Sequence, residues 1–163
     1  MADEIMRARQ RNRSVWIIGN GGSASTAEHF ETDLSFVRDR NLEILPNVNS
    51  LTSNSALVTA TSNDVSFQEL FKVMLTRKAQ SGDLLIAISA SGNSPNILNA
   101  LTLAKALRLR TFSLLGFDGG ESVTQSDDAI LVLTEVGEYG IVEDIHLSIC
   151  HAVSARIREE LAN

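Results

Sequence analysis

Cysteine, proline and long apolar runs are scarce in this sequence, and each scarcity excludes a class of protein. The 163 residues contain one cysteine, Cys150, so no internal disulfide framework exists, and we expect a reducing compartment, the cytoplasm. Only two prolines occur, and no Pro-rich or low-complexity stretch divides the chain, which favours a single domain over residues 1–163. No apolar run approaches the ~18 residues of a membrane span, and no charged-then-apolar leader is present.

Positive charge is also in deficit. Lysine and arginine number 14 against 20 acidic residues, which gives a formal net charge of −6. The chain therefore lacks the basic field that attracts nucleic acid or an anionic membrane, and we expect neither as a partner. An anionic substrate would have to be held by local hydrogen-bond donors.

Apolar runs of strand length alternate with segments of helical periodicity. The expected strands are residues 15–18, 84–88, 111–115 and 129–133, and residues 44–51 are ambiguous, a strand interrupted by Pro46. The expected helices are residues 1–13, 24–37, 54–61, 67–80, 95–107 and 139–161. This order predicts an α/β fold, a three-layer α-β-α sandwich with a central parallel sheet.

A serine-rich turn, residues 89–94, follows the expected strand 84–88 and precedes a helix that opens on Pro95. Ser89, Ser91 and Ser94 bring three hydroxyls to a helix N-terminus, where unpaired amides and the helix dipole favour an anion. The alternative is a helix N-cap together with turn-forming residues, but the turn needs only one cap. The turn therefore predicts a phosphate site.

A glycine-rich turn, residues 19–24, follows the first strand. Gly19, Gly21 and Ala24 match the G-x-G-x-x-A pattern of dinucleotide-binding proteins. That pattern expects an acidic residue after the second strand, and Glu43 is only a loose candidate. It also leaves the second phosphate-type turn unexplained. A Walker loop is excluded because no Gly-Lys-Ser/Thr follows the glycines.

Histidines and carboxylates recur at helical spacing on two of the expected helices. His29 and Asp33 lie four residues apart, and Glu143 and His151 lie two turns apart. Two imidazoles and two carboxylates can form a tetrahedral zinc site if the helices meet, although spacing alone fits solvated surface pairs equally well. Cys150 lies in an apolar stretch and is interpreted as a core residue rather than a nucleophile.

Four segments in order, residues 19–23, 62–64, 89–94 and 118–120, resemble the sugar isomerase (SIS) domain family. The resemblance runs from about residue 14 to residue 160 and is greatest to sedoheptulose 7-phosphate isomerases. It implies a flavodoxin-like nucleotide-binding type of fold. It also implies zinc bound by His29, Asp33, Glu143 and His151, with Asp33 and His151 moving protons. The substrate-binding positions that it implies are Asn20, Gly21, Gly22, Ser23, Asn63, Asp64, Ser89, Ala90, Ser91, Ser94 and Glu143.

Four residues at three places depart from the family pattern. Asp33 stands where the family has Glu, Glu143 stands where it has Gln, and Phe36-Val37 stand where it has Gly-Arg, with Arg38 next. The resemblance implies isomerisation of sedoheptulose 7-phosphate to D-glycero-D-manno-heptose 7-phosphate by a homo-oligomer, a tetramer or dimer. Three alternatives stay open: a non-catalytic phosphosugar-binding adaptor like the replication-initiator-associating proteins, an isomerase of another sugar phosphate, and a dinucleotide-dependent enzyme.

Overall fold

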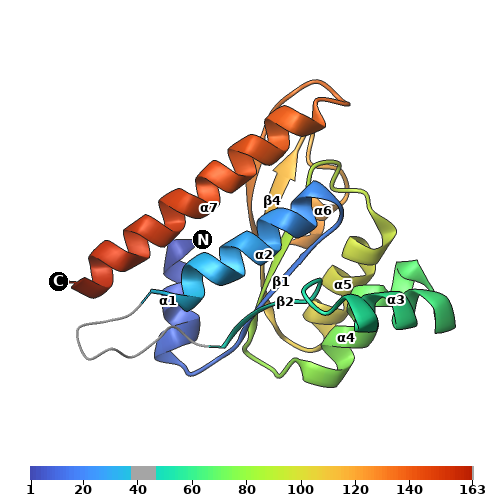
Figure 1. Cartoon of the computed structure of the whole chain (residues 1–163), viewed down its shortest axis with the longest axis horizontal. Helices are drawn as coiled ribbons and strands as arrows, with labels where there is room; N and C mark the ends of the chain where they lie inside the picture. Colours follow the sequence, from blue (N-terminus) through green and yellow to red (C-terminus); the bar gives the residue numbers. More distant parts are fainter. Residues whose placement is uncertain (38–46, 163) are drawn as a thin grey trace.

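The computed structural model describes residues 1–37 and 47–162. Five parallel strands form one sheet in the order β2-β1-β3-β4-β5. The strands are β1 (Val15–Gly19), β2 (Val48–Ser50), β3 (Leu84–Ser89), β4 (Arg110–Gly116) and β5 (Asp128–Val132). The helices are α1 (Ala2–Gln10), α2 (Gly22–Ser35), α3 (Ser55–Asp64), the short 3₁₀ helix η1 (Phe67–Glu69), α4 (Leu70–Lys78), α5 (Pro95–Ala106), α6 (Ser122–Gln125) and α7 (Tyr139–Ala162) (Figure 1).

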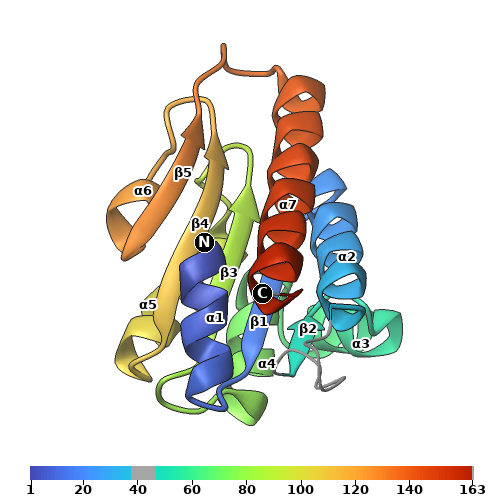
Figure 2. The same cartoon turned by 90° about the vertical axis from the view of Figure 1, so that its left-hand side faces the viewer.

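The predicted three-layer sandwich is confirmed. Helices α1, α2 and α7 bury their apolar faces on one side of the sheet, where Phe30 and Leu34 of α2 meet Ile17 and Ile86 (Figure 2). Helices α4 and α5 cover the other side, where Phe71 packs with strand residues whose side chains point to that side, such as Ile18 and Leu85. Central strands β1 and β3 are buried at every position, because both faces of a parallel sheet are covered by helices.

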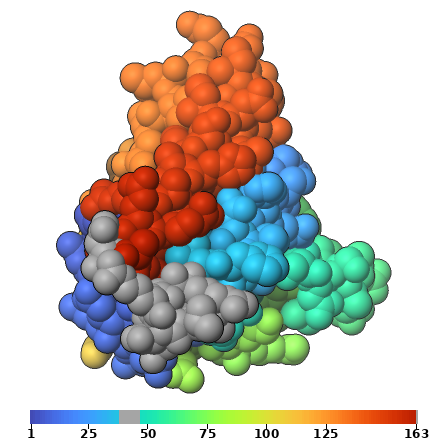
Figure 3. Space-filling model, turned by 60° about the vertical axis from the view of Figure 1, so that its left-hand side comes forward, coloured from blue at the N-terminus to red at the C-terminus, as the bar shows by residue number. Residues whose placement is uncertain are grey.

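The two longest helices of the first face, α2 and α7, run side by side in the same direction. Their contact follows from the sheet: α2 leaves β1 and α7 returns over β1 and β3. In the space-filling view the pair forms a continuous surface (Figure 3). This arrangement decides which side chains of the two helices can meet.

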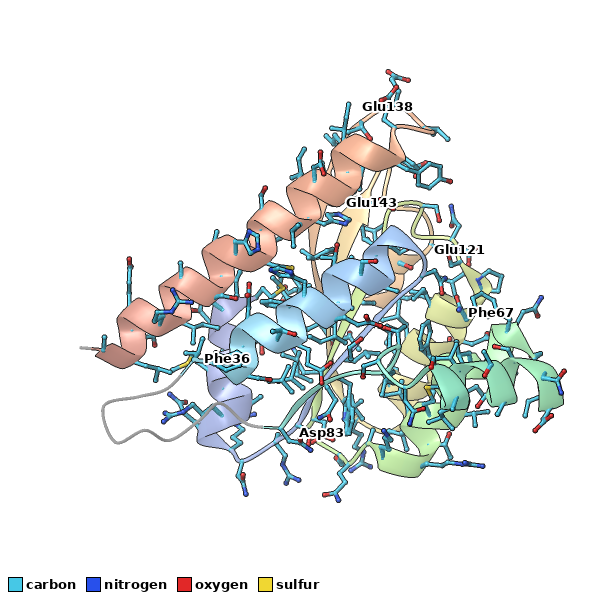
Figure 4. The ribbon with its side chains drawn as sticks, viewed as in Figure 1. Phe36, Phe67, Asp83, Glu121, Glu138 and Glu143 are labelled. Atoms are coloured by element: carbon cyan, nitrogen blue, oxygen red, sulfur yellow. The ribbon has the colours of Figure 1, made fainter. Side chains whose placement is uncertain are left out.

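A buried carboxylate holds together the first residues of the neighbouring strands β1 and β3. Asp83 is 3% exposed and accepts hydrogen bonds from the Ser14 amide at 3.0 Å, the Trp16 indole at 2.9 Å and the Gln80 amide at 2.9 Å (Figure 4). It thereby ties the start of β1 to the start of β3. Because this buried carboxylate accepts three hydrogen bonds, its role is structural.

Several boundaries differ from the sequence-based expectation. The ambiguous segment 44–51 contains the short strand β2, and its residues 44–46, with Pro46, lie outside the described part of the chain. The expected helix 67–80 is a 3₁₀ turn followed by α4, because Ser66 caps the Glu69 amide and starts a separate turn. Helix α3 extends to Asp64, and α6 was not expected. Within the described residues, no helix is both long and apolar enough to cross a bilayer.

Candidate functional site

The two turns singled out from the sequence lie at the switch point of the sheet. Strands β1 and β3 are neighbours, and Gly19 at the end of β1 is paired with Ile88 near the end of β3. In a sheet of this strand order, ligands bind where the chain reverses direction across the sheet, beyond these two carboxyl ends. Helices α2 and α5 both begin here, at Gly22 and Pro95, so two helix N-termini point to the same edge.

A reciprocal amide pair joins the two turns. Asn20 and Asn96 each donate their side-chain amide to the other's oxygen, both at 2.9 Å, and Asn96 is 1% exposed. Asn20 belongs to the glycine-rich turn, whereas Asn96 lies in the first turn of α5. The pair therefore fixes one turn against the other. Asn96 was missed from the sequence, because nothing local identifies the partner of a side chain 76 residues away.

A cavity of about 140 Å³ opens between these turns and α7. Its described lining contains no lysine or arginine; the residues are Asn20, Ser23, Ile88, Ser89, Ala90, Ser91, Ser94, Tyr139 and Glu143. The sequence predicted all of these except Ile88 and Tyr139. Tyr139, the first residue of α7, packs edge-on against Phe117 with ring centroids 5.1 Å apart. Only the packing of α7 over the sheet brings it to the cavity.

The serine hydroxyls are available to donate hydrogen bonds. The Gly92 amide donates to Ser89 Oγ at 3.1 Å, and the Asn93 amide donates to Ser91 Oγ at 3.3 Å. Each oxygen is thus held by a backbone amide while its own proton is left for another acceptor. Ser94 is the N-cap of α5 but makes no capping bond with its side chain. Ser89 and Ser91 thus stabilise the turn itself, Ser94 does not cap α5 with its side chain, and all three hydroxyls line the cavity.

The segment after β4 packs against the serine-rich turn. Gly92 has φ +62, and a Cβ at that position would lie 2.0 Å from the Gly119 carbonyl oxygen. Ser122 donates to the Gly92 carbonyl through both its amide, at 3.0 Å, and its hydroxyl, at 2.7 Å. The segment Asp118-Gly119-Gly120 therefore shapes the cavity without lining it.

Glu143 is a residue of α7, and its carboxylate lies beside the first residue of α2, Gly22. Figure 4 shows its side chain between α7 and that helix end, and a Cβ placed on Gly22 would lie 2.1 Å from Glu143 Oε2. Glycine at position 22 is what leaves room for this carboxylate. A carboxylate beside a helix N-terminus is stabilised by the helix dipole, but it would repel a phosphate held at close range.

His29, Asp33 and His151 form a cluster on the outer surface of the α2–α7 pair. The Nε2 atoms of His29 and His151 lie 2.9 Å apart, and Asp33 places Oδ1 3.6 Å from His29 Nε2 and Oδ2 3.8 Å from His151 Nε2. The two imidazoles are about half exposed, at 49% and 51%, and Asp33 is 27% exposed. The sequence predicted these residues, and the structure brings them together.

The donor set and its spacing fit zinc. Two ligand atoms on one tetrahedral zinc at ~2.0–2.1 Å lie about 3.3 Å apart. Here the two imidazole nitrogens lie 2.9 Å apart, and each has an Asp33 oxygen close to that spacing, Oδ1 at 3.6 Å from His29 and Oδ2 at 3.8 Å from His151. The expected fourth ligand is corrected, however. Glu143 is not part of this group, because it lies eight residues before His151, about 12 Å along the helix, and its carboxylate lies against Gly22. The cluster offers three ligands, the number typical of catalytic zinc.

Two other titratable groups of α7 face the interior. Cys150 is buried, and burial together with the nearby charge of Asp33 raises its pKa to about 12, which agrees with a core thiol and not a nucleophile. His146 is fully buried, and neither ring nitrogen has a hydrogen bond to the described residues. Burial lowers the pKa of His146, and the Leu115 backbone opposes this shift.

Not every predicted residue reaches the site. Asn63 and Asp64 end α3, are exposed, and hydrogen-bond to each other at 2.8 Å; neither is among the described residues that line the cavity. Gly21, with φ +53, faces open space beside it. Arg38 and Glu43 lie outside the described residues. Phe36, which stands in place of the family glycine, is 73% exposed at the end of α2 (Figure 4).

The geometry agrees with comparisons to known proteins. The SIS domain family profile matches residues 1–116. A phosphoheptose isomerase of Chlorobaculum parvum is 38% identical, over 94% of this chain and 73% of its own length. One from Pelobacter propionicus is 34% identical over 99% of this chain and 84% of its own. The chain belongs to the phosphoheptose isomerases of the SIS domain family. A phosphoheptose isomerase structure from Francisella tularensis overlays with a TM-score of 0.87 at 26% identity, covering 97% of this chain and 83% of that one.

Family membership separates the alternatives left open by the sequence. The relatives and the structure just described are phosphoheptose isomerases, so an isomerase is favoured over a non-catalytic adaptor or a dinucleotide-dependent enzyme. The departures from the family pattern at Asp33 and Glu143 have different settings in the fold. Asp33 lies in the metal-type cluster, whereas Glu143 lies in the serine-lined cavity.

Proposed function

We propose that this chain interconverts sedoheptulose 7-phosphate and D-glycero-D-manno-heptose 7-phosphate. The observation that carries the proposal is the pairing of a serine-lined phosphate cavity with a His29–Asp33–His151 cluster on adjoining parts of α2 and α7. Family membership supplies the substrate, since the similar proteins are named phosphoheptose isomerases. The working unit in this proposal is one domain, residues 1–163, in a cytoplasmic homo-oligomer.

The phosphate in this proposal is bound by Ser89, Ser91 and Ser94. Their hydroxyl protons are free to point into the cavity because backbone amides already hold the oxygens of Ser89 and Ser91. The N-termini of α2 and α5 add a favourable field in place of a lysine or arginine. Glu143 then accepts hydrogen bonds from sugar hydroxyls and does not contact the phosphate, because a carboxylate is a strong acceptor.

Zinc would be held by His29, Asp33 and His151, with the fourth position left for water or substrate oxygen. When bound there, zinc supplies electrophilic polarisation of the sugar oxygens. The ligands come from two helices fixed by core packing, so the cluster is positioned before any ligand binds. Neutral imidazole nitrogens and a carboxylate suit this metal.

The proposed chemistry is a proton transfer through an enediol. Asp33 removes the proton from C1 of the ketose, and the electron pair of that C–H bond forms the C1–C2 double bond. The C2 oxygen takes a proton and becomes a hydroxyl; His151 would supply that proton from Nδ1, because its Nε2 faces His29 and the zinc position. Return of a proton to C2 and loss of the O1 proton complete the aldose, so the net reaction neither gains nor loses atoms. Positioned acid–base groups of this kind contribute about 10²–10⁴ in rate.

The test is isotopic exchange in zinc-loaded protein. Incubation with sedoheptulose 7-phosphate in D₂O should place deuterium on the carbon next to the carbonyl and yield the aldose. Other ketose phosphates should be turned over more slowly in a parallel screen. If folded, zinc-loaded protein gives neither exchange nor aldose, the proposed reaction is wrong.

A further inference from the structure

A second cavity, of about 270 Å³, lies on the β2 side of the glycine-rich turn. Its apolar lining is Val58, Phe67, Leu70 and Phe71, and Thr52, Ser55 and Thr59 also line it. Phe71 and Leu70 are core residues, whereas Phe67 is 53% exposed (Figure 4). A sugar phosphate carries hydroxyls along its whole chain and has no group that fills an apolar cavity. The isomerase reaction therefore leaves this cavity unexplained.

The apolar cavity adjoins the serine-lined cavity. Asn20 lines both of them, and its side chain is fixed by Asn96. Gly21, the next residue, lines the apolar cavity. It has φ +53, and no heavy atom lies within 4 Å of the place where a Cβ would be. One ligand can therefore pass over bare backbone from one cavity to the other.

Two of the three small residues of this turn, Gly19 and Gly21, have the roles that they have in dinucleotide-binding turns. A Cβ on Gly19 would lie 2.5 Å from the Ser23 carbonyl oxygen, so Gly19 permits the tight turn. Gly21 allows close approach of a ligand to the backbone. Ala24 is small enough to leave room for the apolar cavity, which it lines. The G-x-G-x-x-A pattern in the sequence thus has a matching geometry, next to a cavity of suitable character.

We propose that the apolar cavity binds the base of a nucleoside monophosphate whose phosphate occupies the serine-lined cavity. Pockets for drug-sized ligands begin near ~300 Å³, so a cavity of about 270 Å³ suits a smaller planar group such as one base. Phe67 offers an exposed ring for stacking. Glu28, a residue of α2 that also lines the cavity, offers a carboxylate as hydrogen-bond acceptor for the ribose hydroxyls.

The consequence is regulation. The nucleotide and the sugar phosphate need the same serine hydroxyls, so they exclude each other. This part rests on the phosphate role proposed above, whereas binding of the base does not. The experiment uses adenosine, AMP and inorganic phosphate as separate probes, which keeps the two assignments distinct.

Isothermal titration calorimetry on the full chain tests the proposal. AMP should bind about 5-fold or more tighter than inorganic phosphate, because stacking of one base on an aromatic ring is worth at least that factor. Phe67→Ala should remove this advantage while leaving the affinity for inorganic phosphate unchanged. Val65→Ala is the matched control, since Val65 is 57% exposed, lies two residues away and does not line the cavity. AMP should also raise the KM for sugar phosphate without changing kcat.

Three results would overturn the proposal. AMP and inorganic phosphate could bind equally well, or Phe67→Ala could weaken both by the same factor, which indicates only a structural role. Phe67→Ala could also change the oligomeric state without reducing AMP affinity, which would assign the cavity to a second copy of the chain. Adenosine binding that depends on Phe67, without any phosphate binding, supports the apolar site and instead contradicts the proposed phosphate cavity.

Discussion

The Nε2 atoms of His29 and His151 lie 2.9 Å apart although 122 positions separate the two residues in the chain. Both imidazoles direct the same nitrogen to each other, and Asp33 places one carboxylate oxygen near each of these nitrogens. At most one of two facing imidazole nitrogens can donate to the other, and a metal ion satisfies both at once.

Zinc binding should depend on His29 and His151. Protein purified without chelator should contain near-stoichiometric zinc by mass spectrometry, and His29→Ala or His151→Ala should lose most of it. Asp144→Asn is the control, because Asp144 is an exposed carboxylate of α7 outside the cluster. Equal zinc content in all four proteins would contradict the assignment.

Asp33 should be essential for turnover and dispensable for phosphate binding. Asp33→Asn keeps the shape but removes the base, so kcat should fall by about 10²–10⁴ while the affinity for sugar phosphate changes little. Asp33→Glu tests reach, since misplacement of a catalytic group by ~1 Å costs about 100-fold. If the family geometry holds, Asp33→Glu retains or raises activity; if the backbone of α2 has compensated for the shorter side chain, Glu is the poorer residue. Steady-state kinetics with a binding titration separates the two.

The serine hydroxyls should carry phosphate affinity. Ser89→Ala with Ser91→Ala should weaken sugar-phosphate binding by about 2–4 kcal/mol, roughly 30- to 1,000-fold, because two charge-assisted hydrogen bonds are removed. Ser148→Ala is the control, since that hydroxyl donates to the Asp144 carbonyl away from the cavity. The assignment is wrong if the folded double variant binds substrate as the wild type does.

Gly22 and Glu143 should be coupled. In Gly22→Ala the new methyl would lie 2.1 Å from Glu143 Oε2, so the carboxylate must leave the cavity. Gly22→Ala should therefore alter substrate KM in the wild type and much less in a Glu143→Ala background, and a double-mutant cycle measures the difference. Strictly additive effects would show that Glu143 does not occupy this place in solution.

His146 should make the fold sensitive to acid. Its pKa is lowered by burial in the folded state, whereas in the unfolded chain it returns to about 6.5. The unfolded state then binds more protons, so this contribution to stability is complete above pH ~6.5 and is lost as pH falls toward the folded-state value. Thermal melts between pH 5 and 8 should show a flatter pH dependence for His146→Leu than for wild type. Parallel curves would contradict the prediction.

The placement of the glycine-rich and serine-rich turns could be predicted from the sequence because the signals are local. Buried strands read as continuous apolar runs, and a turn that directly follows such a run must lie at the carboxyl edge of the sheet. The helical repeat likewise places His29 and Asp33 on one face of α2. These inferences need only the chain's own periodicity.

Site residues supplied by other elements could not be found in this way. Tyr139 reaches the cavity only because α7 packs over the sheet beside α2, and Asn96 is identified only by its pairing with Asn20. Asn63 and Asp64 match a family motif, yet the extension of α3 places them in their own exposed pair. Short-range spacing carries no information on these distances.

The sequence by itself determined the α/β sandwich, the two phosphate-type turns at one sheet edge, and which residues could bind metal. The tertiary structure decided which of them meet. Helices α2 and α7 run in the same direction, so His151 lies opposite His29 while Glu143, two turns earlier, lies opposite Gly22. Local periodicity fixes the face of a helix on which a residue lies. Only the packing of the two helices on the shared sheet fixes their relative position along the axis, because that position depends on contacts between residues far apart in the chain.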